Sequence, residues 1–425
     1  MSGPQPGKSM AKKLRVAVNA RVFMDWSGGI DFIIYLANAL AVNNNFRTYF
    51  LVPDSAGGPE VYLTNTQETE KLRPTGYKKY TQRFQRLKVA EDFSLHPSLK
   101  DLAQNIKVLP YPNSVDGFMA ALHKVRADVV LPTTAAFGPA FPYPWVGYIW
   151  DYQHKYFPQY FNDNELKNRD KIFAKIMEQA PSVIVNSEAT GKDIRKFMRR
   201  FSNSRKITAL PFAPYPSKSW LDQDPEVVKD KYKIKKPYFI VCNQFWLHKS
   251  HSTVIDAMAV LQKSHPGIDL VCTGKLEEPR EPKYITQIKR RIKDKGLSKK
   301  VHLLGLVPKD DQIALLKGSL ALIQPTLYEG GPGGGAAYNA IALGVPVIAS
   351  DIPVNLEMHE KQVEFFKTKS AADLASKMSG LSGKESYRPN NHQIINDGQR
   401  RLEKLCVSLS KAINMAARDY KVKDA

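Results

Sequence analysis

A carboxylate followed by a glycine-rich segment is the part of the sequence best suited to chemistry. Glu329 precedes six positions, 330–335, of which five are glycine, and small residues then predict a helix over 336–343. A helix N-terminus presents free backbone N–H groups and the positive end of its dipole, so it favours an anion such as phosphate. Glycine lets a ligand approach the backbone because no Cβ stands in the way. The segment therefore predicts an anion-binding loop, with a flexible connector as the simpler alternative.

Polar residues and glycines also follow predicted strands in the N-terminal half. Asp151 and His154 come after the apolar run 146–150, and ligands of open α/β sheets bind outside the carboxyl ends of strands. Both are candidates for contacting a substrate, although a packing or capping role explains His154 equally well. Gly28 and Gly29 follow the first apolar run and precede a helical pattern. This pair is a second candidate for close backbone approach, and a tight turn is nearly as good an explanation.

The elements that would position these residues repeat one arrangement. Short apolar strands alternate with glycine turns and helical segments over 14–52 and again over 321–349, which is the βαβ unit of a parallel sheet. A chain of 425 residues is long enough for two such domains. Three prolines in the segment 211–217 predict the linker between them, because proline excludes helix and interior strand. A last helix is predicted over 392–417.

Composition excludes several classes of protein. The chain is 43% hydrophobic, enough for substantial cores, and none of its apolar runs approaches the length of a membrane span. The three cysteines, Cys242, Cys272 and Cys406, form neither a disulfide framework nor a metal-binding spacing, which fits a reducing cytosol. No signal-peptide core is present, and residues 1–12 predict a disordered leader.

The formal net charge of +21 predicts anionic partners: acidic lipid headgroups, a phosphorylated substrate or nucleic acid. Many basic residues gather in two clusters, of which the first lies in a predicted polar insertion over 55–102. No zinc-finger, RRM or KH pattern accompanies them, so nucleic acid is the weaker interpretation, and a solvated face explains either cluster alone. The two clusters are Lys71, Arg73, Lys78, Lys79, Arg83, Arg86 and Lys88, and Lys192, Arg195, Lys196, Arg199, Arg200, Arg205 and Lys206.

The region around the glycine loop resembles the signature of the retaining GT-B glycosyltransferases of family four, the glycosyl transferases group 1. The order of strand, Glu329-Gly330, small-residue helix, Leu343-Gly344-Val345-Pro346-Val347-Ile348 and Ser350-Asp351 is similar to that signature. The loop is two residues longer than in the family, and Asn339 stands where the family has a second acid. An amide can hydrogen-bond a ribose hydroxyl, but only as a neutral partner.

The resemblance implies a function for each candidate residue. A lysine and an arginine of the family neutralise the donor diphosphate; Lys249 matches the lysine and Gln244 replaces the arginine, so Lys275 is a candidate for the second cation. The implied reacting centre comprises Glu329, Lys249, His154 and Asp151. The implied donor-binding set comprises Gly28, Gly29, Gln244, Lys249, Lys275, Glu329, Gly330, Gly333, Gly334, Gly335 and Asn339.

The resemblance also implies an α/β protein of the GT-B fold, with two Rossmann-like domains facing across a cleft and a C-terminal helix that crosses back to the first domain. The expected parts are 13–215, with the basic insertion, for the acceptor, 216–390 for the nucleotide sugar, and 391–425 for the crossover helix and tail. Such a protein would be a hexosyl- or deoxyhexosyltransferase.

The implied reaction moves a sugar from a nucleotide-diphosphate donor to a glycan or lipid-linked acceptor with retention. No metal and no cofactor are expected, because no convincing Asp-x-Asp pattern is present. The resemblance is to enzymes of bacterial polysaccharide or O-antigen synthesis, so a cytoplasmic location is expected, with docking to the anionic inner face of the cell membrane. Two alternatives stay open: a degenerate glycosyltransferase that serves as a binding or scaffold protein, and a basic nucleic-acid-binding protein.

Overall fold

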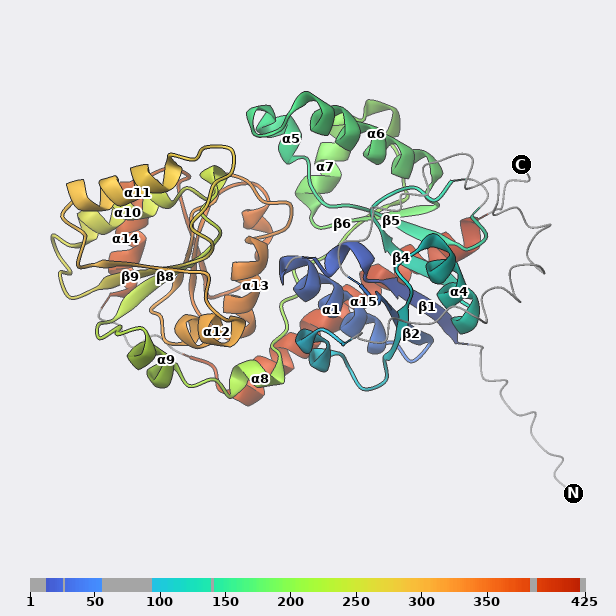
Figure 1. Ribbon diagram of the computed structural model, residues 1–425, viewed down its shortest axis with the longest axis horizontal. Coiled ribbons are helices and arrows are strands. Elements are labelled where there is room, and N and C mark those ends of the chain that lie inside the picture. Colours follow the sequence, from blue (N-terminus) through green and yellow to red (C-terminus); the bar gives the residue numbers. More distant parts are fainter. Residues whose placement is uncertain (1–12, 26, 56–93, 139–140, 383–387, 421–425) are drawn as a thin grey trace, which may run out of the picture.

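Two α/β lobes and a long C-terminal helix make up the molecule (Figure 1). The computed structural model describes residues 13–25, 27–55, 94–138, 141–382 and 388–420. The predicted leader and the first basic cluster therefore lie outside the described residues, as does most of the predicted insertion. Each lobe is built on a parallel sheet, because apolar runs that are buried on both faces alternate with helices that cover them.

The first sheet has the strand order β3-β2-β1-β4-β5-β6-β7 among the described residues, with every pair parallel. Its strands are β1 (Leu14–Asn19), β2 (Phe46–Pro53), β3 (Lys107–Tyr111), β4 (Val129–Thr133), β5 (Trp145–Ile149), β6 (Ser182–Val185) and β7 (Ile207–Ala209). Its helices are α1 (Ser27–Ala41), α4 (Val115–Val125), α5 (Gln153–Tyr156), α6 (Asp163–Gln179) and α7 (Glu188–Phe197), with short 3₁₀ turns η1 (Arg21–Phe23), η3 (Pro97–Asp101), η4 (Pro158–Tyr160) and η5 (Arg199–Phe201).

The second sheet has the order β10-β9-β8-β11-β12-β13 and is also parallel. Its strands are β8 (Tyr238–Cys242), β9 (Asp269–Thr273), β10 (Val301–Gly305), β11 (Leu322–Gln324), β12 (Val347–Ser350) and β13 (Val363–Phe366). Its helices are α8 (Lys218–Leu221), α9 (Pro225–Lys231), α10 (His251–Leu261), α11 (Tyr284–Asp294), α12 (Lys309–Lys317), α13 (Gly334–Ala342) and α14 (Ala371–Leu381), with the 3₁₀ turns η6 (Leu247–Lys249) and η7 (Asn355–Glu357).

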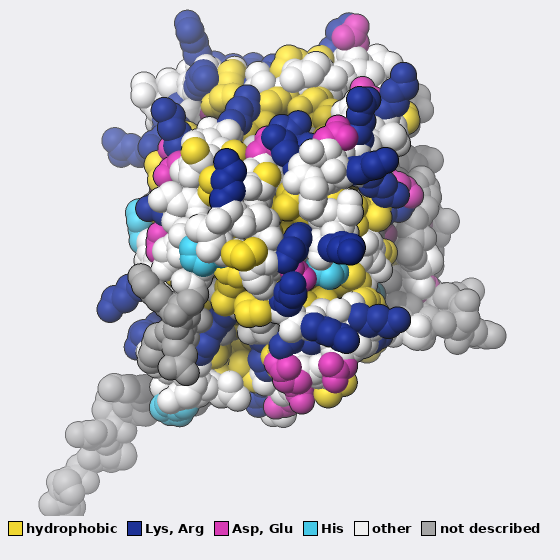
Figure 2. Space-filling model, turned by 90° about the vertical axis from the view of Figure 1, so that its left-hand side faces the viewer, with side chains coloured by type: hydrophobic (Ala, Val, Ile, Leu, Met, Phe, Trp, Pro, Cys, Tyr) yellow, Lys and Arg dark blue, Asp and Glu magenta, His cyan; other side chains and the backbone are white. Residues whose placement is uncertain are grey.

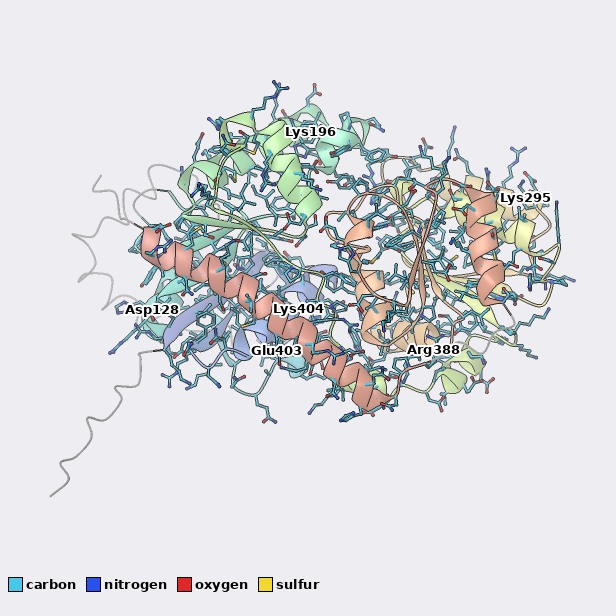
Figure 3. The ribbon with its side chains drawn as sticks, turned by 180° about the vertical axis from the view of Figure 1, so that it is seen from behind. Asp128, Lys196, Lys295, Arg388, Glu403 and Lys404 are labelled. Atoms are coloured by element: carbon cyan, nitrogen blue, oxygen red, sulfur yellow. The ribbon has the colours of Figure 1, made fainter. Side chains whose placement is uncertain are left out.

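Helix α15 (Asn391–Asp419) starts beside the second lobe and runs across the back of the first (Figure 3). Its apolar side joins the core formed by β1, α1 and β2, with Leu402, Leu409 and Ile413 fully or nearly fully buried. Glu403 and Lys404 lie on its opposite, exposed side. The prediction of two Rossmann-like domains with a helix that crosses back is therefore confirmed.

One predicted boundary at the glycine segment is wrong. The loop was expected to extend to position 335, but α13 already begins at Gly334, so the last two glycines form its first turn. Helix α13 ends at Ala342 because Gly344, with φ of +68°, reverses the chain there. The second basic cluster is not a solvated face throughout. Lys206 is part-buried, and its ammonium donates to the backbone carbonyls of Met177 and Ala180. Burial lowers the pKa of Lys206.

Candidate active site

The second sheet has a switch point between β8 and β11. The strand order reverses there, so the segments that follow these two strands diverge and leave a crevice, where ligands of open α/β sheets bind. Lys249 ends η6, the turn after β8, and Glu329 follows β11. Two residues predicted for the reacting centre therefore lie at the switch point.

Lys249 and Glu329 form an ion pair in the structure. The Lys249 ammonium lies 2.5 Å from Oε1 of Glu329, and the two side chains are only 11% and 10% exposed. Two opposite charges this close and this well shielded satisfy each other, and removing either would leave a nearly buried charge without a partner. The structure thus brings together the cation expected to neutralise the diphosphate and the acid of the expected reacting centre.

Gln324, which the sequence analysis did not single out, holds the acid in place. This fully buried residue ends β11 and donates through Nε2 to Oε1 of Glu329 at 3.3 Å and to the Gly333 carbonyl at 2.6 Å. Its own oxygen accepts a hydrogen bond from Asn243 Nδ2 at 2.8 Å. A glutamine at the end of an otherwise apolar strand was the signal that could have identified it, because buried amides require partners.

The glycine loop brings backbone against the same carboxylate. Gly333 and Gly334 have φ of +64° and +60°, a conformation that favours glycine, and the Gly333 N–H donates to Asn355 Oδ1 at 2.9 Å. A Cβ on Gly334 would lie 2.9 Å from Oε2 of Glu329, whereas a Cβ on Gly335 would meet nothing within 4 Å. The N-terminus of α13 therefore lies beside the Glu329 carboxylate, at the end of the helix that favours an anion.

The other end of the loop touches the first domain. A Cβ on Gly330 would lie 2.4 Å from the Trp150 carbonyl oxygen and 2.9 Å from Cβ of Asp151. The Gly330 carbonyl accepts hydrogen bonds from the hydroxyls of Ser187, at 3.1 Å, and Thr190, at 3.0 Å. The two domains are therefore in contact across the crevice, and glycine is needed at position 330 for this approach.

Asp151 lies on the first-domain side of this contact. Its Oδ1 accepts hydrogen bonds from the Arg169 guanidinium at 2.5 Å and from the Gln153 backbone N–H at 2.8 Å. Arg169 in turn lies over the ring of Trp150, 5.4 Å from its centroid. The structure thus places Asp151 beside the loop that follows Glu329, with its charge already paired.

His154 has a different environment from the one expected of a substrate contact. Its side chain is fully buried, Nε2 is 2.9 Å from Oδ1 of Asp170, and the ring stacks on Tyr152. Burial lowers the pKa of His154, although the bond with Asp170 opposes this. Nδ1 has no hydrogen-bond partner among the described residues. The structure therefore supports the packing alternative, and a contact of His154 with substrate stays a prediction.

Gln244 and Lys275 meet at the ends of β8 and β9. The Gln244 side-chain oxygen accepts a hydrogen bond from the Lys275 backbone N–H at 2.7 Å. The Lys275 ammonium is instead exposed and pairs with Glu277 at 2.7 Å. In this arrangement Lys275 does not add a second cation to the Lys249–Glu329 pair, and its predicted contact with a diphosphate would require the side chain to move.

The remaining predicted donor contacts lie on helices at the domain boundary. Gly28 and Gly29 are in the first turn of α1, and α1 reaches the second domain through Asp31, whose carboxylate is 2.8 Å from the Lys309 ammonium. Asn339 lies on α13 and is 5% exposed, and its Oδ1 has no hydrogen-bond partner within the described ranges. A ribose hydroxyl would satisfy that oxygen, and this contact stays a prediction.

A model of a known protein family matches most of the second domain. Residues 223–401, which contain Lys249, Glu329 and the glycine loop, match the family model described as glycosyl transferases group 1. Residues 223–401 of this chain are therefore similar to the glycosyl transferases group 1. Mannosylfructose-phosphate synthase of Agrobacterium fabrum is 23% identical over 131 residues. That similarity covers 30% of this chain and only 28% of the relative.

Similarity to solved structures shows that the two described domains have the GT-B fold. Sucrose-phosphate synthase from Thermosynechococcus elongatus is 14% identical, with a TM-score of 0.60, over 94% of this chain and 98% of that one. HepE from Anabaena, solved with UDP and glucose, is 16% identical with a TM-score of 0.52 over 96% of each chain. A UDP-forming trehalose-phosphate synthase from Burkholderia xenovorans is 12% identical with a TM-score of 0.56, over 95% and 98%.

Glu357, which lies within the matched residues 223–401, also bridges the two domains. The carboxylate of Glu357, in η7, accepts hydrogen bonds from the backbone N–H groups of Glu188 at 2.9 Å and Ala189 at 2.7 Å, the first two residues of α7. A helix N-terminus favours a carboxylate in this position. Burial nevertheless raises the pKa of Glu357, and the two N–H bonds oppose that rise. No local pattern pointed to this contact, because its partners are far apart in the chain.

The surface charge is broadly distributed on one end of the molecule. On the face that carries α10, α11 and α14, Lys and Arg side chains are spread over the surface and do not form a single patch (Figure 2). The run Lys289-Arg290-Arg291 is exposed there, as expected for a solvated helix face. None of the helices within the described ranges is long and apolar enough to cross a membrane.

Proposed function

We propose that this protein is a glycosyltransferase that moves a sugar from a nucleotide-diphosphate donor to a glycan or lipid-linked acceptor. The observation that carries the proposal is the Lys249–Glu329 pair beside the N-terminus of α13, at the switch point of a sheet that faces a second domain. This pair lies within the residues that match the group 1 family.

The arrangement can support such a reaction through an exchange of partners. A donor diphosphate would bind the Lys249 ammonium and N–H groups at the N-terminus of α13, and Glu329 would then accept hydrogen bonds from sugar hydroxyls. The leaving diphosphate gains negative charge as the glycosidic bond breaks, and a positioned cation and helix N-terminus stabilise that charge. The contacts of Gln324 keep the Glu329 carboxylate in place during the exchange.

The first donor to test is a UDP sugar. HepE was solved with UDP-glucose, and the Burkholderia synthase is described as UDP-forming. Sugar phosphates belong in the acceptor panel beside glycans and lipid-linked sugars, because several relatives are sugar-phosphate synthases.

A thermal-shift panel of UDP, GDP, dTDP and CMP sugars tests the proposal, because a ligand that binds only the folded state raises its Tm. We expect one nucleotide class to raise the Tm of the wild type and not of Lys249→Ala. Nucleotide release with the acceptor panel then tests transfer. No shift with any nucleotide sugar would contradict the proposal.

A degenerate glycosyltransferase that binds without transferring is the second candidate. The neutral Gln244 and Asn339 favour it, as does the pairing of Lys249 with an acid of the same chain. The two functions differ in one measurement: the degenerate protein would show a donor-induced thermal shift without nucleotide release under any acceptor.

We further propose retention at the anomeric carbon, independence of metal, and a place in cell-surface polysaccharide synthesis at the cytoplasmic side of the membrane. Product anomers resolved by NMR test retention, and activity after chelation tests metal independence. Docking to anionic vesicles, which predicts binding that weakens with salt, tests the membrane surface as a partner.

A further inference from the structure

Glu278 is a buried acid of the second domain to which the proposed reaction assigns no part. It lies in the segment 274–283 between β9 and α11, and its side chain is fully buried. Burying a charged carboxylate is unfavourable unless hydrogen-bond donors surround it. Burial on its own would raise the pKa of Glu278, but the hydrogen bonds with Arg280 and with backbone N–H groups outweigh it and lower the pKa, so the group stays charged.

Four donors converge on the two carboxylate oxygens of Glu278. Oε2 accepts hydrogen bonds from the Leu247 backbone N–H at 2.8 Å and from Nη2 of Arg280 at 3.0 Å. Oε1 accepts hydrogen bonds from the backbone N–H and from Nε of Arg280, at 3.1 and 2.7 Å. Only a carboxylate can accept at both oxygens, because a glutamine would turn its NH₂ group toward two of these donors.

The bond to Leu247 connects Glu278 with the turn that carries the predicted diphosphate-binding lysine. Leu247 begins η6, and Lys249 ends it. A second contact supports the segment just before this turn, because the Gln244 side-chain oxygen accepts a hydrogen bond from the Lys275 backbone N–H at 2.7 Å. The segment after β9 therefore fixes the segment after β8 at the point where the chain leads to Lys249.

The arginine that pairs with Glu278 also reaches the first domain. The guanidinium carbon of Arg280 lies over the ring of Tyr160, 5.0 Å from its centroid, and Tyr160 ends η4. The centroid of the Tyr160 ring is also 6.4 Å from that of His248, the middle residue of η6. The turn that carries Lys249 is therefore contacted both by the first domain and by Glu278.

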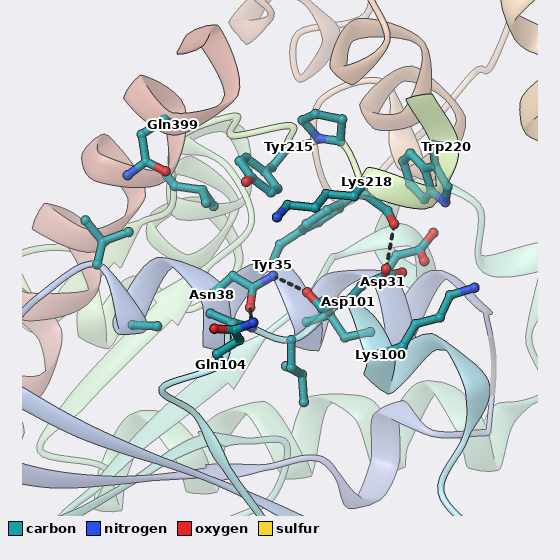
Figure 4. Close-up of a pocket in the computed structure, with 18 of the residues that line it drawn as sticks. Asp31, Tyr35, Asn38, Lys100, Asp101, Gln104, Tyr215, Lys218, Trp220 and Gln399 are labelled. Carbon is teal, nitrogen blue, oxygen red and sulfur yellow. Dashed lines mark hydrogen bonds between the residues drawn. The ribbon is translucent and has the colours of Figure 1, made fainter. Parts of the chain in front are cut away.

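Other acids at the domain boundary hold different parts of the molecule. Asp101 accepts a hydrogen bond from the Ser217 hydroxyl at 2.5 Å, and Asp31 lies 2.8 Å from the Lys309 ammonium. Both acids line a cavity beside the interdomain linker (Figure 4), and Glu278 does not. Their bonds hold the linker and the domain boundary, whereas the bonds of Glu278 hold η6.

We propose that Glu278 is a positioning residue for donor binding: it holds η6 so that the Lys249 ammonium stays at the switch point when a diphosphate replaces Glu329 as its partner. This inference rests on the proposed function, because it takes Lys249 as the cation that binds the diphosphate. A cation that is already held in place loses less conformational freedom on binding, so it binds more tightly. Gln324 holds the acid of the pair, and Glu278 holds the turn of the cation.

Labelling of lysines with acetic anhydride, followed by mass spectrometry, tests the position of Lys249 without a ligand. Lys249 is paired and only 11% exposed, so it should react slowly in the wild type. Glu278→Gln should speed this reaction about fivefold or more, because an NH₂ group then faces donors that a carboxylate accepts. The exposed Lys263 is the internal reference. Asp256→Asn is the matched control, because Asp256 also accepts from Arg291 through both oxygens but does not contact η6.

Titration with UDP, GDP, dTDP and CDP, and with the nucleoside of the diphosphate that binds, tests the consequence. Glu278→Gln should weaken the diphosphate about tenfold and leave the affinity for the nucleoside unchanged. A general defect of the fold would weaken both ligands, and Asp256→Asn should weaken neither. Glu278→Asp keeps the charge and both acceptor oxygens, so it should recover part of the affinity, and it carries the test if Glu278→Gln does not fold.

The outcomes separate this inference from the proposed function. If no nucleoside diphosphate binds the wild type, the proposed function is contradicted, and the labelling rate still decides whether Glu278 positions Lys249. Binding that Lys249→Ala weakens and Glu278→Gln does not would leave the proposed function intact and overturn the inference. Equal labelling of Lys249 in the wild type and in Glu278→Gln would overturn it as well.

Discussion

Separating Lys249 from Glu329 should destabilise the second domain strongly, and removing both charges together should restore most of the stability. The Lys249 ammonium lies 2.5 Å from Oε1 of Glu329, and the two side chains are 11% and 10% exposed. Either single substitution, Lys249→Met or Glu329→Gln, therefore leaves one charge nearly buried and unpaired. Breaking a buried pair costs about 3–5 kcal/mol, and the slight exposure here places the expected loss near the lower end, about 3 kcal/mol. For a domain of this size that corresponds to a fall in Tm of about 6–12 °C.

The double variant distinguishes a coupled pair from two independent residues. With both charges absent no ion is left unpaired, so its stability should lie within about 1 kcal/mol of the wild type. The assay is urea unfolding followed by circular dichroism, with the coupling free energy taken from the four proteins. Lys229→Met is a matched control, because Lys229 pairs with Glu226 at 2.8 Å but these side chains are 22% and 75% exposed. That surface pair should contribute no more than about 0.5 kcal/mol.

Additive effects of the two single substitutions would refute the reasoning. Residues that do not interact add to within about 0.5 kcal/mol, so a coupling energy below that value means that the charges do not depend on each other in solution. The exchange of partners suggested for donor binding would then lose its physical basis, even if both residues were needed for activity.

Three further predictions follow from the site and its surroundings. Gly334→Val should abolish binding of the nucleotide sugar in a titration, because its Cβ would meet the carboxylate of the buried pair and its φ is +60°, whereas Gly335→Ala, with open space around it, should bind normally; equal affinity in both would place the loop outside the donor site. Burial raises the pKa of Glu357, so this carboxyl holds a proton more tightly while the two domains are in contact; that contact should weaken as the pH rises through the raised pKa, and interdomain energy transfer should lose this dependence in Glu357→Gln. Burial lowers the pKa of His248 to about 2 and of His251 to about 3, so their contribution to stability is full above the ordinary value of 6.5 and is lost as the pH falls below it. Urea titrations at neutral pH and one unit below the ordinary histidine pKa should differ by up to about 3 kcal/mol, about 1.4 kcal/mol for each ring, and a pH-independent midpoint would contradict their neutral burial.

Local patterns in the sequence determined most of the fold. The strands β1, β2, β11 and β12 form in the two predicted βαβ units, because a strand buried on both faces of a parallel sheet is a continuous apolar run ended by polar or glycine residues. The final helix, predicted over 392–417, is Asn391–Asp419 in the structure. Lys249 and Glu329 were predicted for one site by resemblance to a family, and the structure places their charged groups 2.5 Å apart.

Only the tertiary structure decided which polar group satisfies which. Lys249 and Glu329 are 80 positions apart, and Glu357 reaches the N-terminus of α7 from 168 positions away. The burial of His154 against Asp170 depends on how α6 packs beside the first sheet. Local propensity determines where a strand or helix forms, but the partner of a charge depends on distance and shielding from water. Those are set only when elements far apart in the chain pack together.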